Sequence, residues 1–407
     1  MIVPRVLIAT TGSLGDLNPM LAIGDHLRAL GADVDFATYP CYERACHENG
    51  FRFFAIGGSG DYVHTLRLTR DMLDEQSFDV FVDRVNFDQL DLSYQQLLEA
   101  AAGADIIVAP SHVAPAHLVA EKLGIPYVAC ALCLIHLKST ATIGTEEYKR
   151  LSASAARWHS VLRKLRESQG LSRKVLPFAS LLSGVTLLLG VLPPYLLSPA
   201  DLRIPSLEVT GYAAFPRTRK TLRDDVLSSF CDERTVAFSF GSFADACDPA
   251  HFFTESLAAC RMLGLKCVYL SKRATPAMLE ASGPDFMVRE DVAPADVFPL
   301  VGITAHHGGT GTLVAACDHP KPMIIVPFFL DQPLHAARMN ALTGCPQISA
   351  RDYDRHSAAE ALKLALQHGH SMTEKIRGLA AQQSDGAERS AHRILSTLAG
   401  ARRLTLG

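Results

Sequence analysis

The chain has 407 residues, more than one hydrophobic core usually holds, so its length predicts two domains. Hydrophobic residues make up 48% and charged residues 20%, with a formal net charge of -3, the profile of an ordinary globular protein. This composition lacks the basic excess that binding to a phosphate backbone requires, which argues against nucleic acid as a partner.

The first predicted strand covers residues 5–10 and runs into a loop that reads TGSLGD. Asn18-Pro19 supplies an N-cap and a first-turn proline for a helix over 19–30, and Gly31 closes that helix. A second strand at 33–38 begins with the sequence DVD, whose two aspartates we interpret as surface charge rather than as metal ligands.

The same strand, helix, strand order recurs over residues 105–110, 117–124 and 126–132. It predicts an open, mostly parallel sheet with helices on both faces. Residues 175–200 carry no charge over a length that suits a membrane span, which is one interpretation. Glycine and proline interrupt this stretch, so we expect a buried strand within 184–191 and a loop after it.

The second half repeats the pattern, with strands expected near 235–242, 266–271, 286–290 and 303–306 and a helix over 252–264. Between the halves, residues 210–225 turn polar and basic, as an interdomain linker would. We therefore predict one domain over 1–214 and a second over 215–385. A terminal helix over 386–407 is expected to pack back on the first domain.

Ten cysteines are scattered without a paired CxxC spacing, and most have apolar neighbours. The apolar stretch at the amino terminus reaches glycine and acid too soon for a signal peptide. Both features predict a cytoplasmic protein with reduced thiols.

A glycine-rich turn follows the predicted strand that ends at His306 and reads HHGGTGT. The glycines Gly308, Gly309 and Gly311 allow a ligand to approach backbone amides at the positive end of the helix that follows. Thr310 and Thr312 add hydroxyl donors, and His306 can donate to a phosphate oxygen. The turn therefore suggests an anion site, although a strand-to-helix connection without a ligand has the same sequence features.

Asp331 and Gln332 follow the apolar stretch MIIVPFF, which we interpret as a buried strand of the same sheet. An adjacent acid and amide offer the acceptors and donors that suit the vicinal hydroxyls of a sugar. The alternative is that the pair only begins the next helix.

Three motifs in this order, namely GSLGDLNP at residues 12–19, HHGGTGT and VPFFLDQ, resemble the UDP-glycosyltransferase superfamily. That superfamily is glycosyltransferase family 1. The resemblance covers essentially the whole chain. It is strongest to the bacterial branch that contains rhamnolipid rhamnosyltransferases, sterol glucosyltransferases and antibiotic glycosyltransferases. The fold implied is α/β of the GT-B type, with two Rossmann-like domains facing each other across a cleft.

The resemblance implies a donor site in the second domain. His306, Ser242 and the turn from Gly308 to Thr312 would hold the diphosphate, and Asp331 and Gln332 would hold the sugar. Val292 falls where plant relatives have a tryptophan that stacks on uracil, so the choice between uracil and thymine stays open. Two further departures are Val314 in place of a ribose-binding glutamate and Pro320 in place of a glycine.

The resemblance also implies an inverting, metal-independent transfer to an acceptor hydroxyl, with a UDP- or dTDP-sugar as co-substrate and no other cofactor. Asp16 occupies the position of the base, in a loop with Gly12, Ser13 and Gly15 on the acceptor side. An ordinary aspartate is a weak base for an alcohol, and a loop-stabilising role is the alternative. His112 can supply basicity or orient Asp16, although a lone loop histidine is more often structural.

The acceptor is expected to be hydrophobic, namely a lipid, a sterol, a polyketide or another natural product. An apolar wall in the first domain is suggested by the apolar stretch near 176–196 and by the aromatic residues Phe51, Phe53, Phe54, Phe78, Phe81 and Phe87. Such a wall also leaves peripheral membrane contact open. The sequence does not specify an oligomeric state. Two alternatives are a nucleotide-sugar escort or sensor without transferase activity and, with less support, a dehydrogenase, whose G-x-G-x-x-G spacing the first loop lacks.

Overall fold

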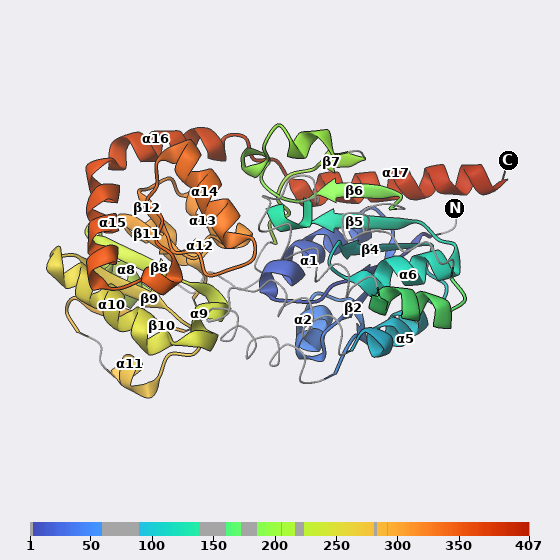
Figure 1. The fold of residues 1–407 in the computed structure, drawn as a ribbon, viewed down its shortest axis with the longest axis horizontal. Coiled ribbons are helices and arrows are strands. Elements are labelled where there is room, and N and C mark those ends of the chain that lie inside the picture. Colours follow the sequence, from blue (N-terminus) through green and yellow to red (C-terminus); the bar gives the residue numbers. More distant parts are fainter. Residues whose placement is uncertain are drawn as a thin grey trace. The chain divides into compact units, whose positions relative to one another are not determined.

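The structure is a computed structural model that describes residues 3–58, 89–137, 160–171, 185–204, 206–215, 224–280, 283–290 and 292–406. The chain divides into two compact units. Unit 1 comprises residues 1–68, 77–216 and 384–407, and unit 2 comprises residues 69–76 and 217–383. Each has its own parallel sheet (Figure 1). Three residues of the apolar wall predicted for the first domain lie outside the described ranges, namely Phe78, Phe81 and Phe87. Residues 172–184 also lie outside them.

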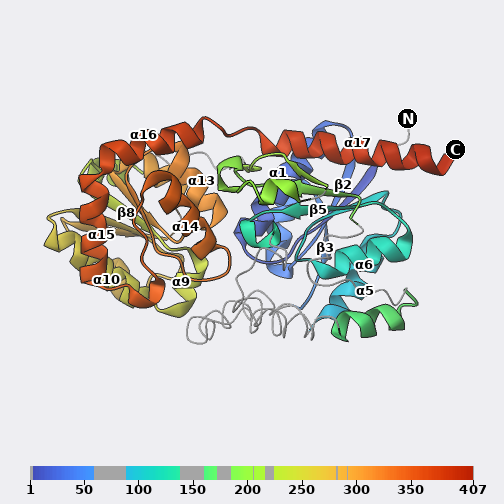
Figure 2. The same cartoon turned by 45° about the horizontal axis from the view of Figure 1, so that its top comes forward.

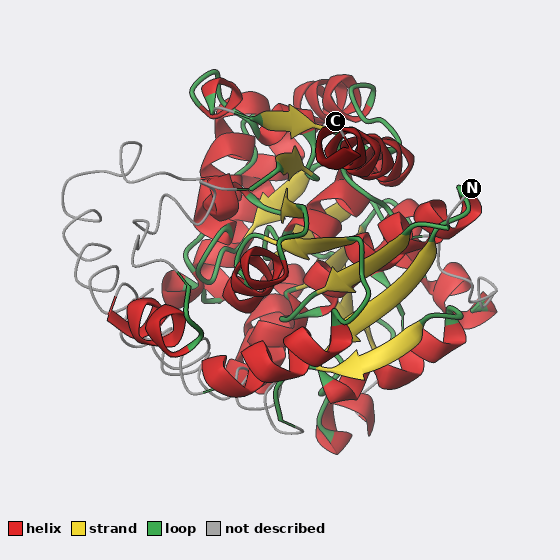
Figure 3. Ribbon diagram, turned by 90° about the vertical axis from the view of Figure 1, so that its right-hand side faces the viewer, coloured by secondary structure: helices red, strands yellow, loops and turns green. Residues whose placement is uncertain are grey.

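The sheet of unit 1 has seven strands in the order β3-β2-β1-β4-β5-β6-β7. Their bounds are β1 Arg5–Ala9, β2 Asp33–Thr38, β3 Arg52–Ala55, β4 Ile106–Pro110, β5 Tyr127–Ala131, β6 Leu187–Gly190 and β7 Leu207–Val209. Helices α1 Leu14–Ala29, α2 Glu43–Glu48, α5 Leu90–Ala100 and α6 Ala114–Leu123 surround the sheet, with a further helix over 160–168 (Figure 3). Short 3₁₀ turns lie at Pro40–Tyr42, Leu134–Leu137, Pro194–Leu196 and Asp201–Arg203. The central strands are continuous apolar runs because helices bury both faces.

The last helix, α17 Gly386–Leu406, belongs to unit 1 and packs against α1 (Figure 2). Its apolar side chains recur at helical spacing and join the core of unit 1: Ala387, Ala391, Ile394 and Leu398. The Ser390 hydroxyl donates to Thr210 Oγ1 at 2.8 Å, and Arg393 forms an ion pair with Glu208. Both contacts attach α17 to β7 and the segment that follows it.

The sheet of unit 2 has five strands in the order β10-β9-β8-β11-β12. Their bounds are β8 Thr235–Ser239, β9 Lys266–Leu270, β10 Phe286–Arg289, β11 Ile303–His306 and β12 Met323–Ile325. The helices are α8 Asp225–Phe230, α9 Gly241–Cys247, α10 Pro249–Met262, α11 Pro276–Glu280, α12 Pro294–Val297, α13 Thr310–Asp318, α14 Gln332–Thr343, α15 Arg355–Gln367 and α16 Gly369–Ala380. Short 3₁₀ turns lie at Phe298–Leu300 and Ala350–Asp352. The strands predicted in both halves are therefore present.

The predicted start of the first helix is wrong. Helix α1 begins at Leu14, five residues before Pro19, because Ser13 and Asp16 form a reciprocal capping box. Pro19 lies inside the helix and cannot donate to the carbonyl of Gly15. The predicted end is confirmed, since Gly31 adopts a left-handed φ of 88° just after the last turn.

The interpretation of both aspartates of β2 as surface charge is also wrong. Asp33 is exposed, whereas Asp35 is 2% exposed and lies between two arginines. Arg5 Nη2 is 2.9 Å from Asp35 Oδ2, and Arg52 pairs with the same carboxylate from the neighbouring strand. A buried carboxylate requires such partners, and sequence periodicity alone does not show them.

The apolar stretch near 175–200 contains β6, whose four residues are buried in the sheet of unit 1. This confirms the predicted strand. Over the ranges that the structure describes, no helix has both the length and the apolar character that crossing a membrane needs.

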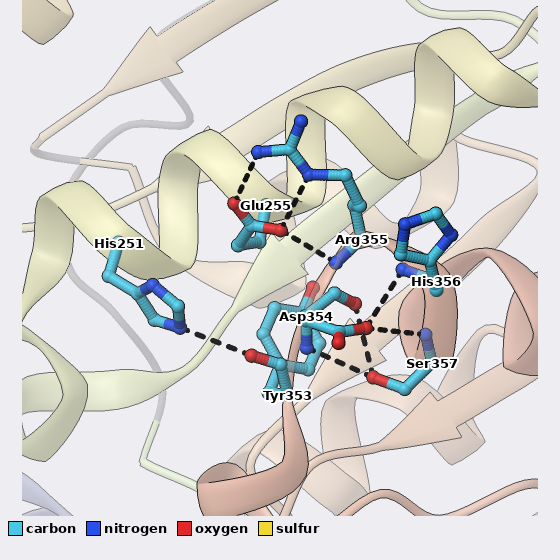
Figure 4. Close-up of polar contacts among 7 residues, drawn as sticks. All are labelled: His251, Glu255, Tyr353, Asp354, Arg355, His356 and Ser357. Carbon is cyan, nitrogen blue, oxygen red and sulfur yellow. Dashed lines mark hydrogen bonds and ion pairs between the residues drawn. The ribbon is translucent and has the colours of Figure 1, made fainter.

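A polar network connects α10 to the start of α15 in unit 2 (Figure 4). The Glu255 carboxylate accepts hydrogen bonds from the backbone N–H, Nε and Nη2 of Arg355, at 2.7, 2.9 and 2.7 Å. These bonds from Arg355 lower the pKa of Glu255 to about 2. Beneath them, the Ser256 hydroxyl and the Tyr353 phenol are 2.6 Å apart and buried. The network therefore fixes Tyr353, whose ring packs on Phe240 just after β8.

We predict that Glu255→Gln lowers the free energy of unfolding at neutral pH by about 1–2 kcal/mol, because the charge-assisted bonds to a half-exposed arginine are lost. The pKa of Glu255 is about 2 in the folded protein and ordinarily 4.5, so its contribution is present above pH 4.5 and falls as the pH drops toward 2. Urea unfolding at pH 7 and pH 3 measures this loss. Glu360→Gln, which removes an exposed carboxylate 3.8 Å from Lys363, is the matched control. A deficit that is equally large at both pH values would contradict the prediction.

Candidate functional site

The strand order of unit 2 reverses direction at β8, since β9 lies on one side of it and β11 on the other. At such a point the chain leaves two neighbouring strands toward opposite faces and opens a crevice at their carboxyl ends. The segment after β8 contains Gly241 and Ser242, and the segment after β11 contains the glycine turn. The N–H of His307 donates to the Ser239 carbonyl at 3.3 Å, which holds the two segments together.

The glycine turn leads directly into α13, a helix of nine residues. Gly308 has a φ of 85°, a conformation that side chains other than glycine rarely adopt, and Gly309 is the N-cap. The N-cap Gly309 receives no side-chain capping bond, and the first-turn amides of Gly311 and Thr312 lie at the positive end of the helix, where an anion can bind. The structure thus gives the predicted diphosphate residues the geometry of an anion site.

His306 is completely buried at the end of β11. Its Nδ1 accepts a hydrogen bond from the Gly308 N–H at 3.2 Å, so the neutral ring carries its hydrogen on Nε2. Burial and the neighbouring His307 lower the pKa of His306 to about 3. Within the described residues Nε2 is buried and has no hydrogen-bond partner. His306 therefore shapes the turn as a neutral group, and any contact with a phosphate needs a local opening.

His307, which is not among the residues predicted for the site, contacts both segments. Its Nδ1 is 3.2 Å from the Ser239 carbonyl and must donate to it, which leaves Nε2 as an acceptor in the neutral ring. Cβ atoms added to Gly241 and Gly309 would lie 2.9 and 2.4 Å from ring atoms of His307. The ring thus packs on the two glycines, each of which precedes a predicted phosphate contact. Burial lowers the pKa of His307 to about 4, so the free protein has no charged imidazole here.

Helix α9 carries Ser242 and is held by Asp245, one turn further along. Asp245 is 8% exposed and accepts from the Ser271 hydroxyl at 2.6 Å and from the Lys272 N–H at 2.9 Å. Burial raises the pKa of Asp245, and these two bonds oppose that rise. The first turn of α9 is therefore fixed to the carboxyl end of β9.

Asp331 and Gln332 lie at the start of α14, after the loop that follows β12. The helix does begin here, but the Asp331 side chain makes no capping bond. Gln332 is buried, and its Oε1 accepts from the Phe328 N–H at 2.9 Å, which leaves the amide nitrogen as the group that a sugar hydroxyl can meet. The structure brings this pair next to the glycine turn, because the Gln332 carbonyl is 3.5 Å from the position of a Cβ on Gly308.

Val292, predicted to contact the base, and Val314, which replaces a ribose-binding glutamate, do not join this cluster. Val292 is half-buried in the segment between β10 and α12, and β10 is the edge strand, two strands from β8. Val314 is buried in α13 and contributes to packing. The structure therefore groups the residues predicted for the diphosphate and the sugar, and it places Val292 at the far edge of the same sheet.

Unit 1 has its own reversal of strand order, between β1 and β4, and the predicted catalytic residues lie there. The Asp16 Oδ2 accepts from the Ser13 N–H at 2.8 Å and from the Ser13 hydroxyl at 3.1 Å. Gly12 has a φ of 107°, and a Cβ there would lie 2.5 Å from the Asp16 carboxylate. The Tyr42 hydroxyl donates to the Gly12 carbonyl at 3.0 Å. Gly15 is exposed in the first turn of α1. Asp16 is thus half-buried and held by its own loop.

His112 contacts that loop through a chain of hydrogen bonds. The Leu132 N–H donates to Nδ1 of His136 at 3.2 Å, so neutral His136 carries its hydrogen on Nε2. His136 Nε2 is 3.1 Å from His112 Nδ1, and His112 Nε2 is 3.2 Å from the Thr11 carbonyl. Because the carbonyl can only accept, the hydrogens run in one direction from Leu132 to Thr11. Both nitrogens of His112 are engaged, which favours an orienting role over proton abstraction.

No family model matches the chain, but individual relatives do. The sterol 3-beta-glucosyltransferase of Pichia angusta is 25% identical over 99% of this chain, although the chain spans only 34% of that protein. The vancomycin aglycone glucosyltransferase of Amycolatopsis orientalis is 28% identical, over 83% of this chain and 84% of that protein. The chain is therefore similar to sterol and antibiotic glycosyltransferases over most of its length. The predicted resemblance is confirmed.

Solved structures confirm the GT-B fold. The glycotransferase of kitacinnamycin has a TM-score of 0.77 at 19% identity and covers 98% of this chain and 100% of its own. The spinosyn rhamnosyltransferase SpnG complexed with thymidine diphosphate has a TM-score of 0.69 at 19% identity, over 96% of this chain and 100% of its own. A further structure of that enzyme contains the spinosyn aglycone, with a TM-score of 0.71 at 18% identity over the same shares.

We predict that His112→Leu lowers turnover of a nucleotide sugar by on the order of 10²-fold, because the Thr11 carbonyl loses its donor and the Asp16 loop shifts. His112→Gln retains an amide N–H at the Nε2 position and should keep most of the activity. The KM for the nucleotide sugar should change little in either variant, since the glycine turn is in the other unit. Initial rates and melting temperatures measure these effects. If the glutamine variant is as inactive as the leucine variant while folded, the ring itself is needed for proton transfer and the orienting role is wrong.

Proposed function

We propose that this chain transfers a hexose or 6-deoxyhexose from a UDP- or dTDP-sugar to a hydroxyl of a hydrophobic acceptor, with inversion and without a metal ion. The observation that carries the proposal is the uncapped amino-terminal end of α13, entered through a glycine turn and adjacent to Asp331 and Gln332. Amides at a helix start suit a diphosphate, and the carboxylate and amide beside it suit the hydroxyls of the attached sugar.

The leaving diphosphate develops negative charge as its bond to C1 of the sugar breaks. The amides of the α13 first turn and the hydroxyls of Thr310, Thr312 and Ser242 are the donors that we assign to this charge. His307 is neutral before binding, because burial lowers its pKa to about 4. An adjacent diphosphate favours the charged ring and so raises that pKa, which lets Nε2 take up a proton and donate.

The acceptor hydroxyl attacks C1 from the face opposite the leaving group, and its oxygen forms the new glycosidic bond. We assign the released proton to the carboxylate of Asp16. Proton transfer to a carboxylate becomes easier late in such a reaction, when the attacking oxygen already carries positive charge. The electron pair of the broken bond leaves with the nucleoside diphosphate, so no further reactant is needed.

The acceptor class follows from the relatives rather than from the site. The relatives compared above are a sterol glucosyltransferase and a vancomycin aglycone glucosyltransferase, and one solved neighbour contains a spinosyn aglycone. These names refer to a sterol and to the aglycones of natural products. We therefore assign to this chain a sterol-like or polyketide-like alcohol as the acceptor. A cytoplasmic location is part of the same proposal.

Thermal-shift measurements with UDP, dTDP and their sugars test the donor site. A ligand that binds only the folded protein increases the free energy of unfolding, by about 2.7 kcal/mol at a ligand concentration a hundred times its Kd, and so raises the melting temperature. We expect UDP or dTDP to raise it and nicotinamide dinucleotides to leave it unchanged. A protein that responds to none of the nucleotides lacks the proposed site.

Asp16→Asn tests the catalytic assignment. The amide oxygen can still accept from the Ser13 N–H, so the loop should keep its shape, while the proton acceptor is lost. We expect transfer or donor hydrolysis to fall by about 10²–10⁴-fold, with the nucleotide-induced thermal shift intact. If the wild-type protein binds nucleotide sugars but shows no turnover, it is an escort or sensor instead of a transferase.

A further inference from the structure

His335 lies one helical turn after Asp331 on α14 and is completely buried. Its Nδ1 is 2.8 Å from the carbonyl of Gly308 and 3.3 Å from Oδ2 of Asp331. The carbonyl can only accept a hydrogen bond, so Nδ1 must carry a hydrogen. One N–H therefore serves the glycine turn and the predicted sugar-binding carboxylate together.

These three groups come from two separate strand ends of unit 2. Gly308 follows β11, whereas Asp331 and His335 follow the neighbouring strand β12. The parallel register of the two strands brings both segments to one edge of the sheet.

The bond to Gly308 also affects the shape of the anion site. Gly308 adopts its left-handed φ of 85° against Ile325 and Gln332, so its carbonyl points at α14 while the following amides lead into α13. A buried carbonyl without a donor would cost about 1–3 kcal/mol of stability. His335 thereby stabilises the Gly308 carbonyl where it is and limits the positions open to Asp331.

We propose that His335 is a positioning residue that aligns the sugar-binding carboxylate of Asp331 with the diphosphate-binding turn. This inference rests on the proposed function, because it concerns how one donor molecule is recognised at two places. His335 touches neither the diphosphate nor the sugar in this assignment. It sets the distance between the groups that do.

The variants that test the role are His335→Leu and His335→Asn. Leucine fills the buried space and has no donor, whereas the asparagine amide can place an N–H where Nδ1 lies. His370→Leu, the same change at an exposed position of α16, is the matched control. Asp331→Asn alone and together with His335→Leu completes a double-mutant cycle, which measures whether the two residues act as one unit.

The measurement is calorimetric binding of the nucleoside diphosphate and of the corresponding nucleotide sugar, with melting temperatures recorded in parallel. We expect His335→Leu to weaken binding of the nucleotide sugar about tenfold and that of the nucleoside diphosphate by less than about threefold, in line with one lost charge-assisted contact. His335→Asn should bind both ligands like the wild type, as should His370→Leu. Adding His335→Leu to Asp331→Asn should cause little further loss.

The inference is overturned if His335→Leu weakens both ligands equally, because that is the result of a purely structural role. It is also overturned if the asparagine variant behaves like the leucine variant, or if the losses of the two single variants add in full. A wild-type protein that binds neither nucleoside diphosphates nor nucleotide sugars refutes the proposed function itself. That outcome is separate, since it appears before any variant is compared.

Discussion

The reversal of strand order at β8 and β11 is the constraint on which the proposed donor site depends. Two adjacent parallel strands end at the same edge, and the chain then departs in opposite directions, so no connecting helix covers the gap. The N–H of His307 bonds to the Ser239 carbonyl across this gap. Cβ atoms on Gly241 and Gly309 would lie 2.9 and 2.4 Å from ring atoms of His307, so only residues without a Cβ fit here. The proposed anion site depends on this packing.

The electrostatics of the site come from the backbone rather than from charged side chains. Burial lowers the pKa of His306 to about 3 and that of His307 to about 4, so both imidazoles are neutral near pH 7. The positive end of the α13 helix dipole is the electrostatic feature that we propose for binding the diphosphate. In that proposal the positive charge of the site increases if His307 takes up a proton.

The sequence predicted those parts of the structure that local chemistry determines. Apolar runs identified the strands, glycines identified the turn beside α13, and the order of motifs identified the GT-B fold. Pro19 is an ambiguous signal for the start of α1, because a proline is common in the first turn but here lies inside a helix whose capping box, Ser13 and Asp16, is one turn earlier. Asp35 was misplaced because its partner arginines come from other strands. A sequence pattern cannot show such contacts.

The histidines are a second case in which a sequence pattern does not show contacts between distant residues. The position of His306 at a strand end predicts a ligand contact, yet its side chain is buried, and His307 lies against both glycine segments. The spacing of Asp331 and His335, four residues apart on one helix, was a signal that could have been used. The bond from His335 to Gly308 cannot be predicted from sequence spacing, because it joins residues 27 positions apart. The link from His136 through His112 to Thr11 likewise depends on the folded sheet.

The central claim, that the first turn of α13 binds the diphosphate of a nucleotide sugar, is tested most directly by amide hydrogen exchange. Exchange should be compared for the free protein, for the protein with UDP or dTDP, and for the protein with the matching nucleotide sugar. The account predicts slower exchange over residues 308–313 with either ligand and additional protection over 329–335 with the sugar attached. Ligand binding that leaves residues 308–313 unprotected while protecting another segment would contradict it.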